Sequence, residues 1–172
     1  MDNPRQIFRL NVGFIVNFPV GHSRDFIFEE IPFVHLPPDL DLHDLSGTTR
    51  ITRTPQGLLV QTKMRASINA ECARCLGDIQ LPLTIDFTEL YAFSERTTSE
   101  SGLILPEDGN IDLTPLVREY MLLEVPINAL CSPTCQGLCP VCGEYLNDNP
   151  HDHGLEAVDP RLAILKDFLE PE

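Results

Sequence analysis

The stretch VQTKMRASINAECARCLGDIQLPLTIDF, from Val60 to Phe87, contains two alternating segments separated by a Cys-x-x-Cys pair. Before the pair, mainly apolar or small residues occupy every second position, with polar and basic residues between them. After the pair, leucine, isoleucine and phenylalanine again occupy every second position. A period of two residues is typical of a strand with one buried face. The stretch therefore predicts two antiparallel strands with one wet face, joined at a tip that carries the cysteines.

The residues before this stretch predict more strands of the same sheet. The segment 48–54 precedes a Pro-Gln-Gly turn at 55–57, so a turn should join it to the strand that follows. Residues 8–18 are apolar at every second position, which predicts a half-buried strand. Residues 25–34 predict another strand, although their pattern is broken. The Pro- and Asp-rich residues 35–45 are expected to form a connection.

The spacing of apolar residues changes towards the C-terminus, from that of a strand to that of a helix. Residues 96–110 are polar and are expected to form a mobile connection. A helix should follow, with Asp112 or Thr114 as its cap, Pro115 in its first turn and Pro126 at its end. Its apolar face should contain Leu116, Val117, Tyr120, Met121 and Leu123. A final helix should start at Asp159–Pro160 by the same logic. The fold class we expect is α+β, a single domain over residues 1–172 that is mainly antiparallel β-sheet with two helices.

Composition restricts the partners and the compartment. The chain has 172 residues and a net charge of −14, from 26 acidic and 12 basic residues, which opposes nonspecific attraction to phosphate backbones. No segment approaches the length of a membrane span. The N-terminal stretch is interrupted by asparagines and lacks a small-residue cleavage site, so we interpret it as mature protein. Without export, disulfides are not expected, and paired cysteines indicate metal ligands or redox thiols.

The six cysteines include two Cys-x-x-Cys pairs, Cys72 with Cys75 and Cys139 with Cys142, each with a glycine one or two residues after its second cysteine. Such a pair at a tight turn points two thiolates at one metal ion, and tetrahedral Zn²⁺ takes four ligands. The alternatives are buried free thiols or a redox pair. A thioredoxin-like redox pair should sit at a strand-to-helix junction, and neither pair does. The spacing therefore favours structural zinc, with one or two ions.

The partition of the ligands has more than one solution. Counting His151 and His153 raises the candidates to eight. In a two-site arrangement, one ion takes Cys72, Cys75, Cys131 and Cys135, and the other takes Cys139, Cys142, His151 and His153. In a single-ribbon arrangement, one ion takes Cys72, Cys75, Cys139 and Cys142, and the histidines are solvated. In both cases the metal would staple the sheet tip to the C-terminal segment.

Other residue patterns are weaker. Five basic residues could form a surface that contacts RNA. They lie in the two predicted strands on either side of the Pro-Gln-Gly turn and at the tip that carries the first cysteine pair: Arg50, Arg53, Lys63, Arg65 and Arg74. The alternative for this group is an ordinary solvated strand face. The chain contains no P-loop, HExxH or Ser/His/Asp motif. Neither cysteine pair has an obvious open position for water, so a catalytic zinc is disfavoured and no catalytic residue is assigned.

Several motifs in one order resemble a known family. They are ECARC at 71–75, a strand ending DFTELY at 91, IDLTPLVREYMLLEVPI at 111–127, CSPTCQGLCPVCGEYLN at 131–147 and DPRLAILKDFL at 159–169. Together they resemble the bacterial YceD-type proteins, the large ribosomal RNA subunit accumulation proteins, over residues 70–169. Many members of that family have Cys-x-Cys where this chain has His151-Asp152-His153, a change that keeps metal-binding residue types.

The resemblance implies a cytoplasmic role in the synthesis, processing or stability of large-subunit (23S) ribosomal RNA. We expect a non-enzymatic ribosome-biogenesis factor that binds ribosomal RNA or a large-subunit assembly intermediate, with structural zinc. One alternative is an adaptor whose acidic C-terminal half meets a basic ribosomal protein. Another is an RNA-processing, metal-dependent enzyme. Salt-dependent RNA binding would separate the first from the second, and turnover of precursor RNA would support the third.

Overall fold

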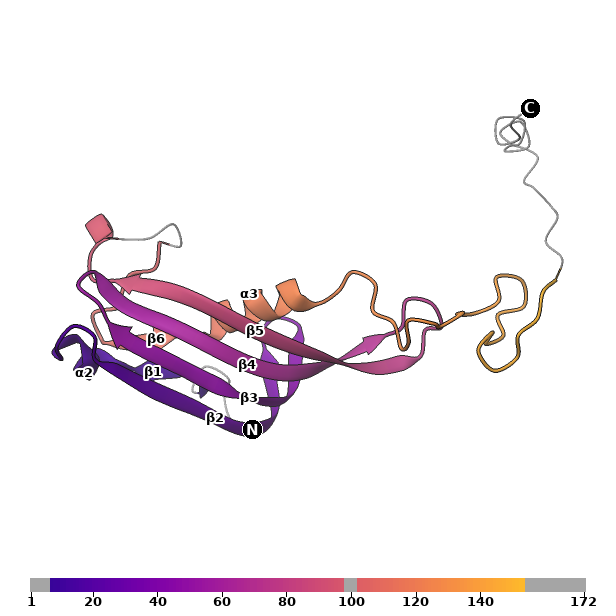
Figure 1. Ribbon diagram of the computed structural model, residues 1–172, viewed down its shortest axis with the longest axis horizontal. Coiled ribbons are helices and arrows are strands. Elements are labelled where there is room, and N and C mark those ends of the chain that lie inside the picture. The colour runs from indigo at the N-terminus through magenta and orange to yellow at the C-terminus, as the bar shows by residue number, and fades with distance from the viewer. Residues whose placement is uncertain (1–6, 98–101, 154–172) are drawn as a thin grey trace, which may run out of the picture.

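The computed structural model describes residues 7–97 and 102–153, and its main element is a four-stranded antiparallel sheet in the order β2-β3-β4-β5 (Figure 1). The strands are β2 (Ser23–Leu36), β3 (Leu40–Arg53), β4 (Gly57–Glu71) and β5 (Asp78–Ala92). A second sheet pairs β1 (Arg9–Asn11) with β6 (Asn110–Asp112). The helical elements are α2 (Gly13–Val16), η1 (Glu95–Thr97) and α3 (Thr114–Glu124). The structure thus confirms the predicted class, mainly antiparallel sheet with two helices.

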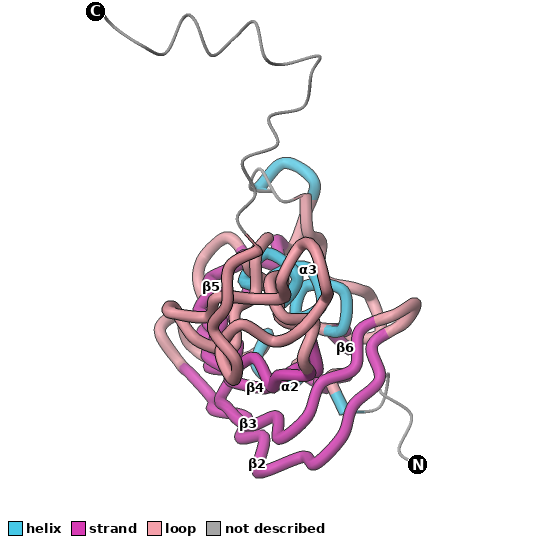
Figure 2. The backbone as a smooth tube through the Cα atoms, turned by 90° about the vertical axis from the view of Figure 1, so that its right-hand side faces the viewer, coloured by secondary structure: helices cyan, strands magenta, loops and turns pink. Residues whose placement is uncertain are grey.

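The hydrophobic core lies between one face of the large sheet and the layer formed by α3 and the β1–β6 pair. Helix α3 packs on β5, and side chains of β1, β6 and α3 join those of the four strands in one buried cluster. The view along the long axis shows α3 and β6 on the same side of the sheet (Figure 2). The opposite face of the sheet is left to solvent, as the alternation in β4 and β5 predicts.

Strands β4 and β5 follow the predicted alternation closely. In β4 the residues from Val60 to Ile68 alternate between buried and more exposed positions, and Lys63 and Arg65 lie on the exposed face. The one polar residue of the buried row, Thr62, shares a hydrogen bond of 3.0 Å with Thr49 of β3. Pairing is continuous from Gly57 with Ala92 to Glu71 with Asp78, so the two strands form a regular ribbon out to the tip.

The connection predicted for residues 35–45 is wrong. Only Pro37, Pro38 and Asp39 separate β2 from β3, and Leu40 and Leu42 are buried in the core. These leucines alternate with aspartates because the strand has one buried and one wet face, and the neighbouring prolines obscured that pattern. Both strands contain a register shift near their middle, between Phe28 and Ile31 in β2 and between His43 and Ser46 in β3.

The N-terminal strand predicted for residues 8–18 is correct only at its start. Phe8, Leu10 and Val12 are buried as expected, but β1 ends at Asn11 and the chain turns into α2. The backbone N–H groups of Val12 and Gly13 both donate to the carbonyl of Gly109, at 2.8 and 3.1 Å. The turn takes the chain away from β6 after three paired residues, and β6 itself is equally short.

Helix α3 begins and ends close to the predicted positions. The backbone N–H of Thr114 donates to the carboxylate of Asp112 at 2.9 Å, and Val117 and Met121 are fully buried. The prediction that Leu123 faces the core is wrong, because its side chain is 74% exposed. The buried row follows the i, i+4 spacing of residues 117 and 121, which turns residue 123 outward.

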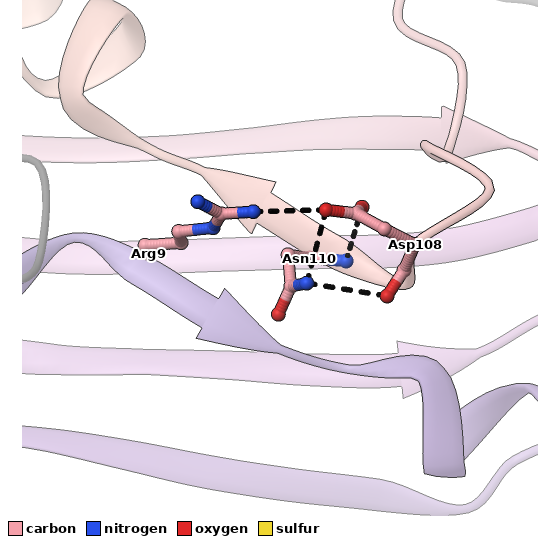
Figure 3. A network of polar contacts seen from close by, with 3 residues as sticks. All are labelled: Arg9, Asp108 and Asn110. Carbon is pink, nitrogen blue, oxygen red and sulfur yellow. Dashed lines mark hydrogen bonds and ion pairs between the residues drawn. The ribbon is translucent and has the colours of Figure 1, made fainter.

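A polar network closes the turn before β6 (Figure 3). The carboxylate of Asp108 accepts bonds from the backbone N–H and the side-chain amide of Asn110, both at 3.0 Å, and from Arg9 at 2.9 Å. Because Arg9 belongs to β1, this network joins both strands of the small sheet. These donors, first the side chain and then the backbone of Asn110, hold the pKa of Asp108 below its ordinary value.

We expect the stabilising effect of Asp108 to depend on pH. A carboxylate whose pKa is lowered on folding stabilises the protein above its unfolded-state pKa of about 3.9. That stabilisation is lost as the pH falls through the lower pKa of the folded state. Asp108→Asn should therefore melt below wild type at neutral pH, and the difference should shrink in acid. Glu107→Gln, at an exposed neighbour, is the matched control. A difference that is constant with pH would contradict the role of the carboxylate.

Two of the predicted segments fall partly or wholly outside the described residues. The final helix expected from Asp159 lies outside them, as do residues 98–101 of the expected polar connection. Within residues 7–97 and 102–153, no helix is long and apolar enough to cross a membrane.

Candidate metal centre

The tip of the β4–β5 ribbon and the chain that follows α3 meet at one end of the molecule (Figure 1). The ribbon extends past the other strands of the sheet, and the segment after α3 runs alongside its tip. Residues 125–153 contain no helix or strand and consist of turns with one isolated bridge, between Leu138 and Tyr145. This irregular segment contains four of the six cysteines and both candidate histidines.

The first group of ligand candidates joins the tip to this segment, and we call it the tip cluster. Its members are Cys72, Cys75, Cys131 and Cys135, whose sulfurs all lie within 4.8 Å of one another. The sulfurs of Cys72 and Cys135 are 3.9 Å apart, and those of Cys75 and Cys131 are 3.7 Å apart. Four sulfurs at about 2.3 Å from a tetrahedral zinc ion are separated by about 3.8 Å. The tip cluster therefore has the dimensions of a zinc site.

The second group lies wholly within the irregular segment, and we call it the loop cluster. Its members are Cys139, Cys142, His151 and His153, again with ligand atoms within 4.8 Å of one another. The sulfur of Cys142 is 3.1 Å from Nε2 of His151. The other ring nitrogen of His151, Nδ1, is 2.8 Å from the carbonyl of Asn149, which can hold the imidazole with Nε2 directed at a metal ion.

These two clusters are the two ligand sets of the two-site arrangement. The four cysteines of the single-ribbon arrangement, which would join the pair at the tip to the pair at 139 and 142, do not form a group among the described residues. Both Cys-x-x-Cys turns have the same backbone hydrogen bonds. At the tip, Cys72 N–H donates to Gly77 and Leu76 N–H donates to Cys72, each at 2.9 Å. In the loop cluster, Cys139 N–H donates to Glu144 at 2.8 Å and Gly143 N–H donates to Cys139 at 2.9 Å. Leu76 and Gly143, which follow the second cysteine, both have a positive φ.

Hydrogen bonds reinforce the junction between the tip and the segment. Ala73 N–H donates to the carbonyl of Ala129 at 2.8 Å, and the guanidinium of Arg74 donates to the carbonyl of Cys135 at 2.6 Å. Gly137 approaches the carbonyl of Arg74 so closely that a Cβ there would lie 2.8 Å from its oxygen. The tip therefore contacts the segment through backbone as well as through sulfur.

The thiols of both clusters have strongly shifted pKa values. Backbone N–H groups, first that of Cys131, lower the pKa of Cys72 to about 6. In the loop cluster the backbone N–H of Cys142 is the main cause that lowers the pKa of Cys139 to about 6. The pKa of Cys131 is raised to about 12, chiefly because the Cys135 side chain lies beside it. Four adjacent thiols can all ionise only when a cation compensates their charge, and a divalent metal ion supplies it.

Sequence reasoning missed Asn147, which supports the tip cluster from outside. Its side-chain amide donates to the sulfur of Cys135 at 3.3 Å, and its carbonyl oxygen accepts from the backbone N–H of Gln136 at 2.7 Å. The side-chain amide is also the main cause that lowers the pKa of Cys135. No spacing rule points to an asparagine twelve residues away. Its role depends on the fold of the loop.

We expect Asn147→Asp to weaken metal binding at the tip cluster. The substitution keeps the shape of the side chain but replaces a donor to sulfur with a negative charge. Loss of such an outer contact typically reduces metal affinity by about 10-fold to 100-fold. Competition with a metallochromic chelator measures the affinity, and Asn128→Asp at an exposed position is the control. Equal affinities in the two variants would contradict the role of Asn147.

Three of the five basic residues assigned to an RNA surface share the wet face of the sheet, namely Arg50, Lys63 and Arg65. Arg50 makes two hydrogen bonds to the carboxylate of Asp25, at 2.7 and 2.9 Å. Lys63 pairs with Asp86 at 2.8 Å. Arg65 has no ion pair among residues 7–97 and 102–153. The charge of this face is therefore largely compensated by cross-strand aspartates.

The other two basic residues are elsewhere. Arg53 lies on the opposite face, where it donates to the carbonyl of Val16 at 3.1 Å and its guanidinium sits 4.3 Å from the ring centroid of Phe93. Arg74 is at the tip, where its bond to Cys135 holds the junction. The structure therefore does not bring all five cations onto one surface.

A comparison with protein families decides the relationship of this chain. The family described as large ribosomal RNA subunit accumulation protein YceD matches residues 60–169. This chain belongs to the YceD family. The matched range begins in β4, somewhat before the predicted start at residue 70, and includes both clusters. The YceD match confirms the resemblance drawn from the cysteine and helix motifs.

Curated proteins from bacteria and plants are similar to this YceD-family chain. An uncharacterized protein of Mycobacterium tuberculosis is 36% identical over 138 residues, which are 78% of this chain and 63% of the relative. The protein YlbN of Bacillus subtilis is 34% identical over 103 residues, 59% of this chain and 60% of the relative. The chain thus spans about three fifths of the length of these relatives.

A plant relative has a functional name. The Arabidopsis thaliana protein named large ribosomal RNA subunit accumulation protein YCED homolog 1, chloroplastic, is 39% identical over 65 residues, 38% of this chain and 20% of the relative. No solved structure matches the chain. Large-subunit ribosomal RNA thus appears in the name of the plant relative, while the two bacterial relatives are described as uncharacterized proteins.

Proposed function

We propose that this protein is a non-enzymatic factor that supports the synthesis, processing or stability of large-subunit ribosomal RNA in the cytoplasm. In this proposal residues 1–172 act as one domain, zinc in the tip cluster holds the irregular segment on the sheet, and zinc in the loop cluster orders the segment itself. The description of the YceD family names large ribosomal RNA subunit accumulation, which supports the cellular role. The observation that carries the metal-dependent part is the tip cluster, whose sulfurs come from both sides of the junction.

The donor count favours a structural metal over a catalytic one. Each cluster offers four protein ligands, which fill a tetrahedral zinc ion and leave no position for water or substrate. A catalytic zinc site typically has three protein ligands and one open position. The proposal for a metal-dependent RNA-processing enzyme therefore receives no support from the clusters.

The packing of the irregular segment explains why it would need metal. Among the described residues, the buried cluster at the tip contains Cys72, Cys75 and Cys135, with Ile79 and Leu130 packed against it. So small an apolar cluster cannot offset the conformational entropy lost by ordering about thirty residues. Metal binding that occurs only in the folded state adds its free energy to folding. In the proposal, zinc takes the place of a hydrophobic core in this part of the chain.

The cellular role is tested by measuring ribosomal RNA. Cells that lack the protein should contain less large-subunit relative to small-subunit ribosomal RNA, and the wild-type protein should restore the ratio. The variant Cys72→Ser/Cys75→Ser, expressed at the same level, should fail to restore it. An unchanged ratio in cells without the protein would refute the role.

A second candidate function is an adaptor between the ribosomal RNA pathway and a basic protein. The ion pairs of Arg50 with Asp25 and of Lys63 with Asp86 favour it, since they compensate the cations that RNA phosphates would need. Net charge supports it as well, because a chain at −14 repels phosphate and attracts cationic partners.

Direct RNA contact and the adaptor function differ in one binding experiment. If the wet face binds RNA, Lys63→Gln/Arg65→Gln should weaken binding to a large-subunit RNA fragment and lower the salt slope by about one unit for each phosphate that is no longer neutralised. Arg74 is kept in this variant, because its bond to Cys135 belongs to the junction. Absence of binding by the wild type at low salt, or equal binding by the variant, would leave the adaptor function as the surviving proposal.

A further inference from the structure

The outward side of α3 combines exposed apolar side chains with two grooves. Leu122 and Leu123 are 40% and 74% exposed, although they are consecutive leucines in a helix that packs on the core. A groove of about 900 Å³ lies on one flank, between α3, β6 and the turn at Asp108. A second groove of about 430 Å³ lies on the other flank, between α3 and β5. Leu123 and Glu119 line both, so they form the ridge between the grooves.

Carboxylates dominate the charge around this ridge. Asp112 and Glu119 line both grooves, and Glu89 lines the smaller one. The only cations among the described residues that line the grooves are Arg9 and Arg118 of the larger one. Arg9 is paired with Asp108 at 2.9 Å, and Arg118 with Asp39 at 2.7 Å. The charge left for a ligand is negative.

Nearby carboxylates contribute to raised pKa values of two tyrosines beside the smaller groove. Burial, followed by Asp112 and Glu89, raises the pKa of Tyr91 to about 12. The pKa of Tyr120 is also raised, first because its hydroxyl donates to Glu89 at 2.8 Å. Neighbouring carboxylates that disfavour a phenolate would favour a cationic side chain placed in the same groove.

We infer that the outward side of α3 docks a basic segment of a partner protein, with apolar side chains of that segment on Leu122 and Leu123 and its cations among the carboxylates. The inference rests on the proposed function, which it extends by giving the partner's chemistry and the surface that receives it. Apolar anchors in a groove with a complementary charged rim are the usual composition of such interfaces. A nucleic acid does not fit here, because its phosphates would face Asp112, Glu119 and Glu89.

A fluorescein-labelled helical peptide made only of leucine and lysine is a direct probe of this surface. Its binding to the full chain is followed by fluorescence anisotropy, and a peptide with glutamate at every lysine position is the charge control. We expect the lysine peptide to bind, with an affinity that falls as salt increases. Leu122→Ser/Leu123→Ser should weaken binding at least about 10-fold, and Glu119→Lys should weaken it and flatten its salt dependence. Val20→Ser, at an apolar side chain 59% exposed between α2 and β2, should change nothing.

Any one of four binding results would overturn the inference. They are no binding by the wild type, equal binding of the glutamate peptide, equal weakening by Val20→Ser, and binding that appears only after residues 154–172 are removed. The last would assign the grooves to the chain's own C-terminal segment. A dimer that dissociates in Leu122→Ser/Leu123→Ser would assign them to a second copy and overturn it too. The ribosomal RNA ratio in cells without the protein is measured independently, so failure of the docking surface is distinguishable from failure of the proposed function.

Discussion

Replacing Cys72 and Cys75 together by serine is expected to release the irregular segment from the sheet tip while the four-stranded sheet stays folded. The two sulfurs are half of the tip cluster, and serine removes them with little change in size. Structural zinc sites contribute about 10 kcal/mol or more of apparent binding free energy, far more than the hydrogen bonds at this junction. The sheet has its own core, built from the buried faces of its strands, and does not depend on these sulfurs.

Amide hydrogen exchange measures this release residue by residue. The amides of Ala73 and Leu138, which donate across the junction, should exchange at least about 100-fold faster in the serine variant. The amides of Val60 and Met64 in β4 should remain protected. Cys139→Ser/Cys142→Ser is the matched control, because it removes the same number of sulfurs from the loop cluster and leaves the tip cluster intact. Unchanged exchange across the junction in the first variant would show that metal does not hold it.

Gly47→Ala is expected to cause a large loss of stability in the sheet. Gly47 of β3 lies opposite Met64 of β4, and a Cβ at position 47 would lie 2.7 Å from both Cα and Cγ of Met64 and closer still to the carbonyl of Lys63. The obstacle is mainly backbone within a paired ladder, so it cannot be relieved by a rotamer change. Overpacking of this kind costs about 3 kcal/mol, which lowers the melting temperature by roughly 10 °C in a chain of this size.

Thermal melting of the full chain tests this expectation. Thr48→Ala, at the exposed neighbouring position on the same strand, should change stability by less than about 1 kcal/mol and is the control. Equal melting temperatures for Gly47→Ala and wild type would contradict the close approach of β3 and β4 at this point.

The elements with a strict alternation were predictable from the sequence, and those set by their neighbours were not. In β4 and β5 apolar side chains lie on the buried face and polar ones on the exposed face, so the pattern from Val60 onward was sufficient to predict both strands. The first half of β3 was missed, because Pro37 and Pro38 next to aspartates resemble a loop. Helix α2 was taken for strand, because the carbonyl of Gly109, almost a hundred residues away, ends β1.

The same distinction holds for the site. The Cys-x-x-Cys turns are local, so their spacing identified the ligand candidates. Which pairs meet depends on how the irregular segment folds back along the tip, and for that reason the sequence left two arrangements open. In the sequence, Arg50 of β3 and Lys63 of β4 looked available for RNA, because the aspartates that pair with them belong to β2 and β5. Their pairing with Arg50 and Lys63 depends on register, which only the folded sheet provides.

Zinc content per chain is the measurement that tests the central claim most directly. Native mass spectrometry of protein purified without chelator should find two zinc ions per chain. It should find one ion in Cys72→Ser/Cys75→Ser and one in His151→Ala/His153→Ala, because each variant removes two of the four ligands of a different cluster. Wild-type protein that folds without metal, or a single ion that the histidine variant retains and the cysteine variant loses, would contradict the two-site account.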